Sequence, residues 1–349
     1  MLHTRALPFV RPDGRTAAEY TFETAGGAQL SVMEYGARIT HLILPASTRN
    51  PAVDVVLGYD DPMRYLSDTA CFGAVCGRFA NRLRGAAFSL GSRRYSLDAN
   101  DGENTLHGGT FGFHRRFFDV CAVDGGLRCH LVSLDGDMGF PGTLDPTVTY
   151  TLTDDAVLRI QYDAFCPDAD TIVNLTNHSY FRLDDADDVL DHRLFVNAAF
   201  YTPADAALLP TGEIRPVAGT PFDLSAPVRL SALLRPCAPA LAATQGLDHN
   251  FVLRKEARDA LTLAAALISS DGGRRMECWT TRPGLQVYTG NGLSGEVCRG
   301  GRAYGPYAGV CLETQLFPDA MTHTHFPSPI LPCGQRCRHT TEYRFFEEE

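Results

Sequence analysis

Short segments in which apolar and polar residues alternate dominate the chain. Val148–Leu152 (VTYTL) and Leu158–Phe165 (LRIQYDAF) alternate with the period of strands that have one buried face. Phe88–Leu90 and Arg93–Leu97 flank the dipeptide Gly91-Ser92, and a short loop that begins with glycine predicts a β-hairpin. Turn signals containing glycine or proline recur at short intervals. The pattern predicts an all-β sandwich or barrel.

Helical periodicity is scarce in the rest of the chain. Ser231–Thr244 (SALLRPCAPALAAT) could hold a short helix, interrupted by Pro236 and Pro239. Ala257–Ala265 fits either a helix or a strand. No change of composition, low-complexity linker or internal repeat divides the chain, which argues against a propeller or a solenoid. We therefore expect one large domain that spans residues 1–349.

Three of the predicted strands have polar side chains on one face and apolar side chains on the other. They are Asn174–Phe181 (NLTNHSYF), Leu285–Thr289 (LQVYT) and Val310–Phe317 (VCLETQLF). An ordinary sheet with one solvated face explains each segment by itself. It explains less well why the faces combine amide, imidazole and phenol groups, which suit a polyhydroxylated ligand such as a sugar. The faces hold Asn174, Thr176, His178 and Tyr180; Gln286 and Tyr288; and Cys311, Glu313, Gln315 and Phe317.

Three predicted loops add candidate binding groups. The first contains Asn81 and Arg82, and an arginine offers a fork of donors to neighbouring hydroxyls or to a carboxylate. In the second, His107 precedes two glycines at a sharp turn of the backbone. The third (LDHNF) contains Asp248 and His249. Each residue alone is more often a solvated surface group, so the loops indicate a site only together with the strand faces.

Metal binding finds little support in the spacing of possible ligands. His323 and His325 form an HxH motif, but prolines surround it and no carboxylate lies close by in the sequence. Asp184–Asp191 (DDADDVLD) offers carboxylates for Ca²⁺ but lacks the spacing of calcium loops, so a solvated loop is the simpler interpretation. We expect no metal. By residue type alone, three histidines could ligate zinc, although no predicted element carries two of them: His107, His178 and His249.

The composition limits which binding partners and which cellular compartment we expect. The chain of 349 residues has 31 Lys+Arg and 41 Asp+Glu and a formal net charge of −10, without a basic stripe, which argues against nucleic acid and anionic membrane surfaces as partners. It has no apolar run of transmembrane length and no uninterrupted apolar stretch of a signal peptide. The 11 cysteines are scattered between Cys71 and Cys337 without a CxxC motif. We therefore expect free thiols in a reducing cytoplasm.

Nine segments match a known family in their order along the chain. With them the sequence resembles the aldose 1-epimerases, also called galactose mutarotases, from about residue 30 to residue 345. NLTNHSYF and LETQ together are highly specific. The resemblance implies a large antiparallel β-supersandwich with a sugar site in a cleft on one sheet, and interconversion of the α and β anomers of free hexoses such as D-galactose or D-glucose without a metal or an organic cofactor. The segments are GRFANRLRGAAFSL, NTLHGGTFGFHRRF, GFPGTLDPTVTYTL, VNLTNHSYFRL, YTPADAALLPTGEI, VAGTPFDL, GLDHNFVL, GLQVYTGNGLSG and VCLETQLFPDA.

The resemblance also implies roles for eight residues. It implies that Glu313 is the catalytic base and His178 the catalytic acid, and opening a hemiacetal does require one proton removed and one delivered. An imidazolium and a carboxylate stabilise each other, so we expect His178 protonated and Glu313 ionised in the resting state. The expected partner is a small monosaccharide, and the expected assembly is a monomer or a homodimer. The implied sugar-binding residues are Asn81, Arg82, His107, Tyr180, Asp248 and Gln286.

Three other functions remain open at this point. A hexose-6-phosphate 1-epimerase on the same fold would need a cationic cluster for the phosphate. A non-catalytic sugar sensor could keep the binding groups, although the presence of both His178 and Glu313 argues against it. A glycosidase would need two carboxylates beside the scissile bond, and Asp248 and Glu313 could be such a pair. The arginine pairs available for a phosphate are Arg82 with Arg84 and Arg115 with Arg116.

Overall fold

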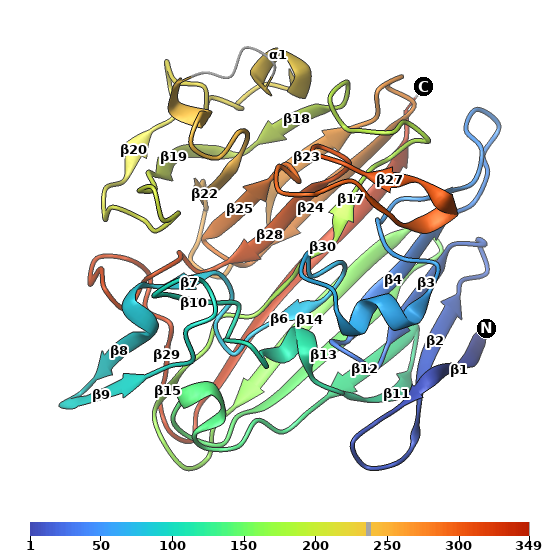
Figure 1. The fold of residues 1–349 in the computed structure, drawn as a ribbon. Coiled ribbons are helices and arrows are strands. Elements are labelled where there is room, and N and C mark those ends of the chain that lie inside the picture. Colours follow the sequence, from blue (N-terminus) through green and yellow to red (C-terminus); the bar gives the residue numbers. More distant parts are fainter. Residues whose placement is uncertain (235–238, 349) are drawn as a thin grey trace.

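The chain folds into antiparallel sheets, and its helices are short turns between strands (Figure 1). The computed structural model describes residues 1–234 and 239–348. Strands make up 44% of the described residues and helices 7%. The prediction of an all-β fold is therefore confirmed.

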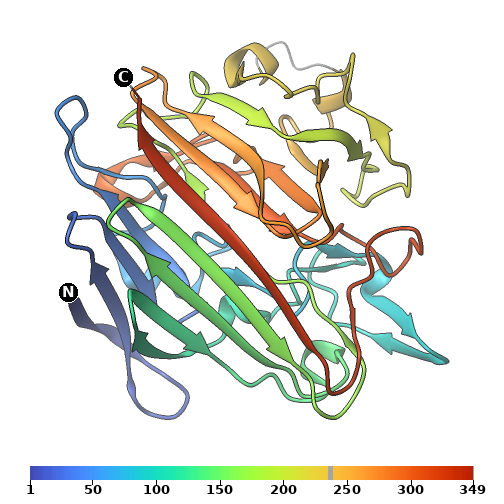
Figure 2. The same cartoon turned by 180° about the vertical axis from the view of Figure 1, so that it is seen from behind.

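The largest sheet has nine strands, and the C-terminal strand β30 lies in its middle. Figure 2 shows β30, in red, between the green β14 and the orange β24. The alternation predicted for Val148–Leu152 and Leu158–Phe165 is confirmed, because buried residues alternate along β13 and β14. The strand order is β11 (Asp119–Val123), β12 (Gly126–His130), β13 (Asp145–Leu152), β14 (Val157–Phe165), β30 (Arg336–Glu347), β24 (Arg274–Thr280), β23 (Thr262–Ile268), β18 (Arg193–Val196) and β21 (Val228–Arg229).

A six-stranded sheet packs against the large sheet through its apolar face. Leu285 and Val287 from one of its strands and Val310 and Leu312 from another join the main hydrophobic core. The hydroxyl of Tyr343 in β30 donates to the carbonyl of Leu312 at 2.8 Å, which ties the two sheets together. The strand order is β17 (Tyr180–Phe181), β28 (Val310–Gln315), β25 (Gly284–Tyr288), β22 (Asp248–Leu253), β19 (Ala198–Thr202) and β20 (Arg215–Pro216).

The N-terminal residues form a third sheet, in which each strand pairs with the next along the chain. Its core-facing residues, such as Leu30 and Ile39, belong to the same main core as the two larger sheets. The sheet therefore adds to one continuous apolar interior. Its strands are β1 (Leu2–Val10), β2 (Thr16–Glu23), β3 (Gln29–Met33), β4 (Arg38–Leu44) and β5 (Val53–Asp54).

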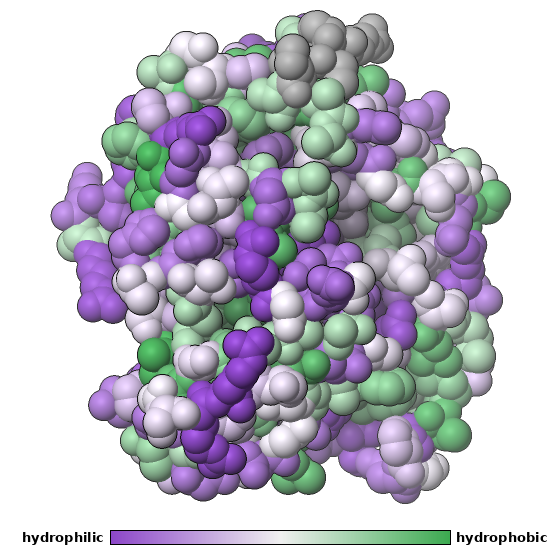
Figure 3. All heavy atoms as spheres, turned by 60° about the vertical axis from the view of Figure 1, so that its left-hand side comes forward, coloured by the Kyte–Doolittle hydropathy of each residue, from purple (hydrophilic) through white to green (hydrophobic). Residues whose placement is uncertain are grey.

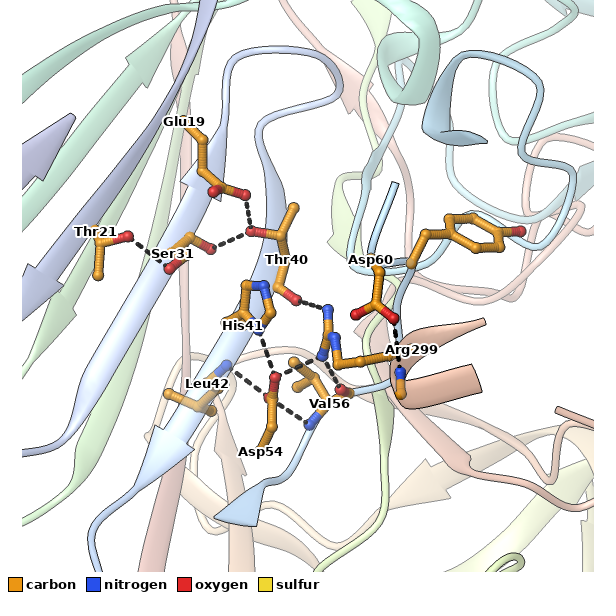
Figure 4. A network of polar contacts seen from close by, with 12 residues as sticks. Glu19, Thr21, Ser31, Thr40, His41, Leu42, Asp54, Val56, Asp60 and Arg299 are labelled. Carbon is orange, nitrogen blue, oxygen red and sulfur yellow. Dashed lines mark hydrogen bonds and ion pairs between the residues drawn. The ribbon is translucent and has the colours of Figure 1, made fainter. Parts of the chain in front are cut away.

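A polar network fastens this third sheet to a loop from the C-terminal half of the chain (Figure 4). The guanidinium of Arg299 pairs with Asp54 at 2.5 Å. It also donates to the backbone carbonyls of Thr40 and Val56, the latter at 2.9 Å. His41 Nδ1 lies 2.6 Å from the same carboxylate. Because both side chains of the ion pair are largely buried, each offsets the cost of removing the other charge from water.

The remaining strands form short pairs, among them the predicted hairpin. β8 (Ala87–Leu90) and β9 (Arg93–Ser96) pair around a turn in which Gly91 has φ 59°, a conformation that suits glycine. The other pairs are β7 (Arg82–Leu83) with β10 (Thr105–Leu106), β6 (Val75–Cys76) with β16 (Thr176–Asn177), β15 (Thr171–Ile172) with β29 (Ile330–Leu331), and β26 (Glu296–Val297) with β27 (Ala303–Tyr304).

The helices of the described residues are short. Within the predicted helical segment Ser231–Thr244, residues 235–238 lie outside the described residues, and short helices lie on both sides of them. The ambiguous segment Ala257–Ala265 runs into strand β23, so its C-terminal end is extended. The helices are η1 (Pro62–Leu66), η2 (Arg84–Ala86), η3 (Phe113–Arg115), η4 (Asp137–Gly139), α1 (Leu230–Leu234), η5 (Pro239–Leu241) and η6 (Arg299–Gly301).

The prediction of one continuous strand over Asn174–Phe181 is wrong. The segment divides into β16, which pairs with β6, and β17, which pairs with β28. The Asn177 side chain accepts hydrogen bonds from the backbone N–H and the hydroxyl of Ser179, at 3.1 and 2.7 Å. Asparagine favours such local turns. The turn places His178 between two strands of different sheets.

The surface carries both hydrophilic and hydrophobic side chains. Hydrophilic and hydrophobic residues are interspersed over the face in Figure 3. No helix among residues 1–234 and 239–348 is long and apolar enough to cross a membrane.

The ten cysteines in this part of the chain are unpaired thiols, as expected, and Cys237 lies outside it.

Candidate active site

A cavity of about 580 Å³ lies at the polar face of the six-stranded sheet. Its volume is in the range of small-molecule binding sites. Gln286, which the resemblance made a sugar-binding residue, is not among the lining residues. The other seven residues with an implied role all line the cavity: Asn81, Arg82, His107, His178, Tyr180, Asp248 and Glu313.

His178 and Glu313 face each other inside the cavity. Nε2 of His178 lies 3.6 Å from Oε1 of Glu313, and the residues are only 6% and 2% exposed. Glu313 Oε2 has no hydrogen-bond partner among the described residues. A buried carboxylate oxygen without a partner is costly, so this atom marks a place where a polar group of a ligand would be stabilised.

Burial controls the protonation of this pair. It lowers the pKa of His178 to about 4. It also raises the pKa of Glu313 well above its ordinary value, and the negative potential of Asp248 acts in the same direction while Arg82 opposes it. These shifts contradict the expectation that the resting pair consists of an imidazolium and a carboxylate, because burial penalises both charged forms. Both shifts favour the uncharged forms, and so favour placing the proton of the pair on Glu313 over His178.

His107 and Asn81 fix each other through backbone hydrogen bonds. Both have positive φ angles, 51° and 66°, which few residues other than glycine adopt. The His107 N–H donates to the Asn81 carbonyl at 3.1 Å, and the Asn81 N–H donates to His107 Nδ1 at 3.2 Å. Burial keeps the pKa of His107 well below its ordinary value. The neutral ring therefore carries its proton on Nε2 and is a hydrogen-bond donor.

Arg82 and Asp248 also line the cavity, and each is paired with another side chain. Arg82 Nε donates to Asp101 at 2.7 Å, which orients the guanidinium. Gln286 Nε2 donates to Asp248 Oδ1 at 2.6 Å, so Gln286 supports Asp248. Burial raises the pKa of Asp248 above its ordinary value.

Aromatic rings surround His178. The ring centroids of His107 and Tyr180 lie 5.3 and 5.1 Å from that of His178, and the ring of Tyr288 lies at 6.3 Å. The Tyr180 hydroxyl donates to the carbonyl of Ala70 at 2.9 Å, which fixes its ring. Tyr180 and Tyr288 both line the cavity and give it apolar surfaces for C–H groups.

Three side chains at the cavity could be considered as metal ligands. Their potential ligand atoms lie within 4.8 Å of one another, and they belong to His107, His178 and Glu313. His249, the third histidine considered from the sequence, is not part of this group. The geometry does not suit a metal, because the Asn81 N–H occupies the Nδ1 lone pair of His107 and leaves a proton on Nε2. A metal ligand needs a free lone pair on its ring nitrogen.

The other sequence candidates for ligand binding have internal partners. His323 and His325 contact the carbonyls of Pro210 and Gly212 through Nε2, at 3.2 and 2.8 Å. In the aspartate-rich loop, Asp184 accepts hydrogen bonds from Ser270, and Asp191 pairs with Arg229. His249 Nδ1 accepts from the backbone of Asp248, and its ring packs on Phe222 at 4.6 Å.

Sequence reasoning missed several contributors to this cavity. Asp101, the partner of Arg82, lies in an Asn-Asp-Gly turn signal that gave no hint of this pairing. Cys71, Tyr59 and Asn291 line the cavity without any sequence signal that we could name. Cys311 was placed on the polar face of its strand but was given no role.

The fold and the site define a β-sandwich protein with a carboxylate and an imidazole in a polar cavity. A family model described as aldose 1-epimerase matches residues 18–344. The chain is 40% identical to the galactose mutarotase of Bos taurus, with 98% of each chain covered, and 35% identical to the aldose 1-epimerase of Escherichia coli K12, with 98% of this chain and 99% of that protein covered. The chain therefore belongs to the aldose 1-epimerase family.

Solved structures agree with this assignment. The galactose 1-epimerase from Lactobacillus acidophilus superimposes with a TM-score of 0.87 at 28% identity, with both chains fully covered. An aldose epimerase homologue from C. elegans superimposes with a TM-score of 0.88 at 26% identity over 96% of this chain and 100% of that chain. The supersandwich fold expected from the resemblance is confirmed.

Proposed function

We propose that this protein interconverts the α and β anomers of a free hexose such as D-galactose or D-glucose, with Glu313 as the base and His178 as the acid. Glu313 takes the proton of the C1 hydroxyl while His178 delivers a proton to the ring oxygen, and the ring opens to the aldehyde. Rotation about the C1–C2 bond exposes the other carbonyl face. The reverse transfers then close the ring and restore both groups.

The opposed pair in the cavity supports this proposal most directly. His178 Nε2 and Glu313 Oε1 are 3.6 Å apart, and one proton serves the pair. Before ring opening that proton belongs on His178, and after ring opening the sugar proton is on Glu313. Polar groups of a bound sugar would replace some of the lost hydration and favour the charged pair. We propose that Asn81, Arg82, His107 and Asp248 orient the hydroxyls and that Tyr180 contacts a C–H face.

The energy that this reaction needs is modest. Positioned proton transfer contributes roughly 10²–10⁴ in rate for each group, or ~3–5 kcal/mol. Two such groups with an oriented substrate suffice for a reaction that already proceeds slowly in water. We therefore propose a mechanism without a metal or an organic cofactor, carried out in the cytoplasm.

The arginines near the cavity argue against a phosphorylated substrate. Arg82 and Arg64 line the cavity, and each pairs with a carboxylate, Asp101 and Glu296. Arg84 pairs with Asp205 and Asp319, and Arg116 with Asp137. A phosphate would compete with these carboxylates, so the free sugar is the better proposal.

Polarimetry of freshly dissolved α-D-galactose tests the proposal. We expect the wild-type protein to accelerate the approach to the anomeric equilibrium, and Glu313→Gln and His178→Asn each to lower kcat by roughly 10²–10⁴-fold. Near wild-type kcat in either variant would refute that residue's role. Acceleration only with glucose 6-phosphate would favour the phosphorylated-sugar epimerase, and sugar binding without acceleration would favour a sensor.

A further inference from the structure

A second cavity, of about 680 Å³, adjoins the cavity of the candidate active site. Residues from four segments line it: 50–56, 182–185, 269–274 and 299–304. Among the described residues, Tyr304 is the one that lines both cavities. The second cavity is large enough for a small molecule, and the proposed reaction does not use it.

The ligand charge that this cavity favours depends on which of its charged side chains are already paired. Four arginines and four aspartates line it. Three of the arginines form ion pairs, whereas Arg182 has no carboxylate within ion-pair distance in the part of the chain that the structure describes. One buried guanidinium is therefore left without a carboxylate. The three pairs are Arg274 with Glu347, Arg299 with Asp54 and Arg302 with Asp185.

The two aspartates outside these pairs have hydrogen-bond donors of their own. Asp184 accepts from the N–H and the hydroxyl of Ser270, at 2.8 and 2.5 Å. Asp271 accepts from the hydroxyl of Ser269 and the N–H of Gly273, at 2.6 and 2.8 Å. A cationic ligand would therefore compete with existing bonds for the lone pairs of these carboxylates.

Arg182 offers unpaired donors at this cavity. The residue is 8% exposed, and both of its side-chain hydrogen bonds come from Nη1, to the carbonyls of Asp187 and Ala308 at 3.2 and 3.4 Å. Its Nε and Nη2 have no hydrogen-bond partner among the described residues. Donors that are buried without an acceptor are costly, and an oxyanion supplies two acceptors to such an edge of a guanidinium.

The charges around Arg182 do not compensate for its burial. Burial lowers the pKa of Arg182, and the positive charge of Arg302 acts in the same direction. Tyr304, Asp184 and Asp185 oppose this shift without reversing it. Arginine still stays charged at neutral pH, so an anion placed against this guanidinium would be stabilised.

Tyr304 adds a second unpaired donor beside Arg182. It is 4% exposed, and its ring centroid lies 5.6 Å from the guanidinium carbon of Arg182. The Tyr304 hydroxyl has no hydrogen-bond partner among the described residues. A phenol and a guanidinium both donate hydrogen bonds to oxyanions, so the two side chains suit the same kind of ligand.

We propose that the second cavity binds a small molecule through an oxyanion group, a phosphate or a carboxylate, held by the unpaired edge of Arg182. Arg302 lines the same cavity and is a second cationic ligand. It is partly exposed, and its partner Asp185 is largely exposed. Such an exposed ion pair contributes little, so Arg302 can exchange Asp185 for the ligand. This binding site goes beyond the proposed function and does not depend on any activity of the protein.

Isothermal titration calorimetry of the full chain at low ionic strength tests the proposal, with inorganic phosphate and acetate as separate probes. We expect the wild type to bind at least one of them, and the tighter probe identifies the group as a phosphate or a carboxylate. Arg182→Gln should weaken that binding about ten- to a hundredfold, because charge-assisted hydrogen bonds are lost. Arg302→Gln should weaken it about two- to fivefold.

Arg229→Gln is the matched control. Arg229 pairs with the exposed Asp191, much as Arg302 pairs with Asp185, but it does not line the cavity. Its replacement should leave the affinity for the probe unchanged. No binding of either probe to the wild type would overturn the proposal, and so would equal losses in Arg229→Gln and Arg302→Gln.

Unchanged affinity in Arg182→Gln would overturn the proposal as well. Because Arg302 is partly exposed, Arg302→Gln keeps the test decisive if Arg182→Gln does not fold, and unchanged affinity there has the same consequence. Binding that is lost in Arg82→Gln and kept in Arg182→Gln would place the anion in the cavity of the candidate active site, which also contradicts a second site.

Discussion

Burial, more than the charge of a neighbour, sets the protonation of His178 and Glu313. The two groups face each other, yet the low dielectric of the cavity favours the neutral form of both. The sequence suggested the opposite resting state, because residue types alone show attraction between an acid and a base and do not show desolvation. Such a pair titrates as a unit.

The pH profile of kcat/KM should reflect this pair. The active form holds one proton, so we expect the rate to fall as the pH decreases through about 4, the pKa of His178, where a second proton is added. We also expect it to fall as the pH rises through the elevated pKa of Glu313, where the last proton is lost. Polarimetry with the spontaneous rate subtracted gives the profile. An acidic limb near the pKa of an ordinary histidine would contradict the burial argument.

Asp248→Asn should move the alkaline limb of that profile. The negative potential of Asp248 helps to raise the pKa of Glu313, so the neutral amide should allow Glu313 to ionise at lower pH. The limb should shift to lower pH, and KM should rise if Asp248 binds the sugar. Gln286→Leu, which removes the partner of Asp248 and keeps its charge, is the comparison. An alkaline limb that stays in place in Asp248→Asn would show that the two carboxyl groups are not coupled.

At the scale of elements, one buried asparagine connects three segments around the site. Asn174 accepts from the N–H of Leu316 at 2.9 Å and donates to the carbonyl of Ala80 at 3.2 Å. It thereby joins the end of β28, which carries Glu313, to the loop that carries Asn81. The sequence placed Asn174 on a binding face, whereas in the structure it is fully buried and bonds to backbone.

Asn174→Ala should therefore lower stability by about 2–4 kcal/mol, because it leaves a buried N–H and a buried carbonyl without partners. Asn100→Ala is a close control. Asn100 makes the same two kinds of bond to Leu106, but on the exposed surface, where water replaces them. We expect a loss of at most about 1 kcal/mol for the control. Urea unfolding of both variants measures the difference, and equal losses would contradict the role of burial.

At the scale of the whole molecule, the ion pair of Arg299 and Asp54 connects the N-terminal sheet to a distant loop (Figure 4). Burial acts to raise the pKa of Asp54, but the hydrogen bond from His41 and the charge of Arg299 outweigh it and hold the pKa below its ordinary value. A carboxyl with a depressed pKa stabilises the fold above its unfolded pKa. That stabilisation is lost as the pH falls through the folded pKa.

Asp54→Asn should accordingly destabilise the protein by roughly 2–3 kcal/mol at pH 7. The difference from wild type should begin to shrink as the pH falls below about 4, where Asp54 of the unfolded chain takes up a proton, and it should vanish only below the depressed pKa of the folded protein. Asp60→Asn is the control, since Asp60 only accepts an exposed backbone N–H from Gly300. Thermal unfolding between pH 3 and 7 shows the trend. A difference that stays constant with pH would mean that the ion pair does not contribute.

The sequence by itself determined the fold class and the family. Alternation along β13 and β14 predicts half-buried strands, and the NLTNHSYF and LETQ motifs carried the family resemblance that the comparisons bear out. These signals are local, because side-chain period and motif spacing are properties of neighbouring residues. That one domain spans residues 1–349 stays a prediction, as do the roles of the site residues.

The tertiary structure alone decided how the site is built. It divided Asn174–Phe181 between two sheets, placed Gln286 beside Asp248 instead of on the cavity wall, and paired Arg82 with Asp101. It also brought Cys311 to His178 across 133 positions of sequence. Contacts and burial of this kind depend on how distant strands pack. Protonation follows from them, because desolvation acts only once the chain has closed around a group.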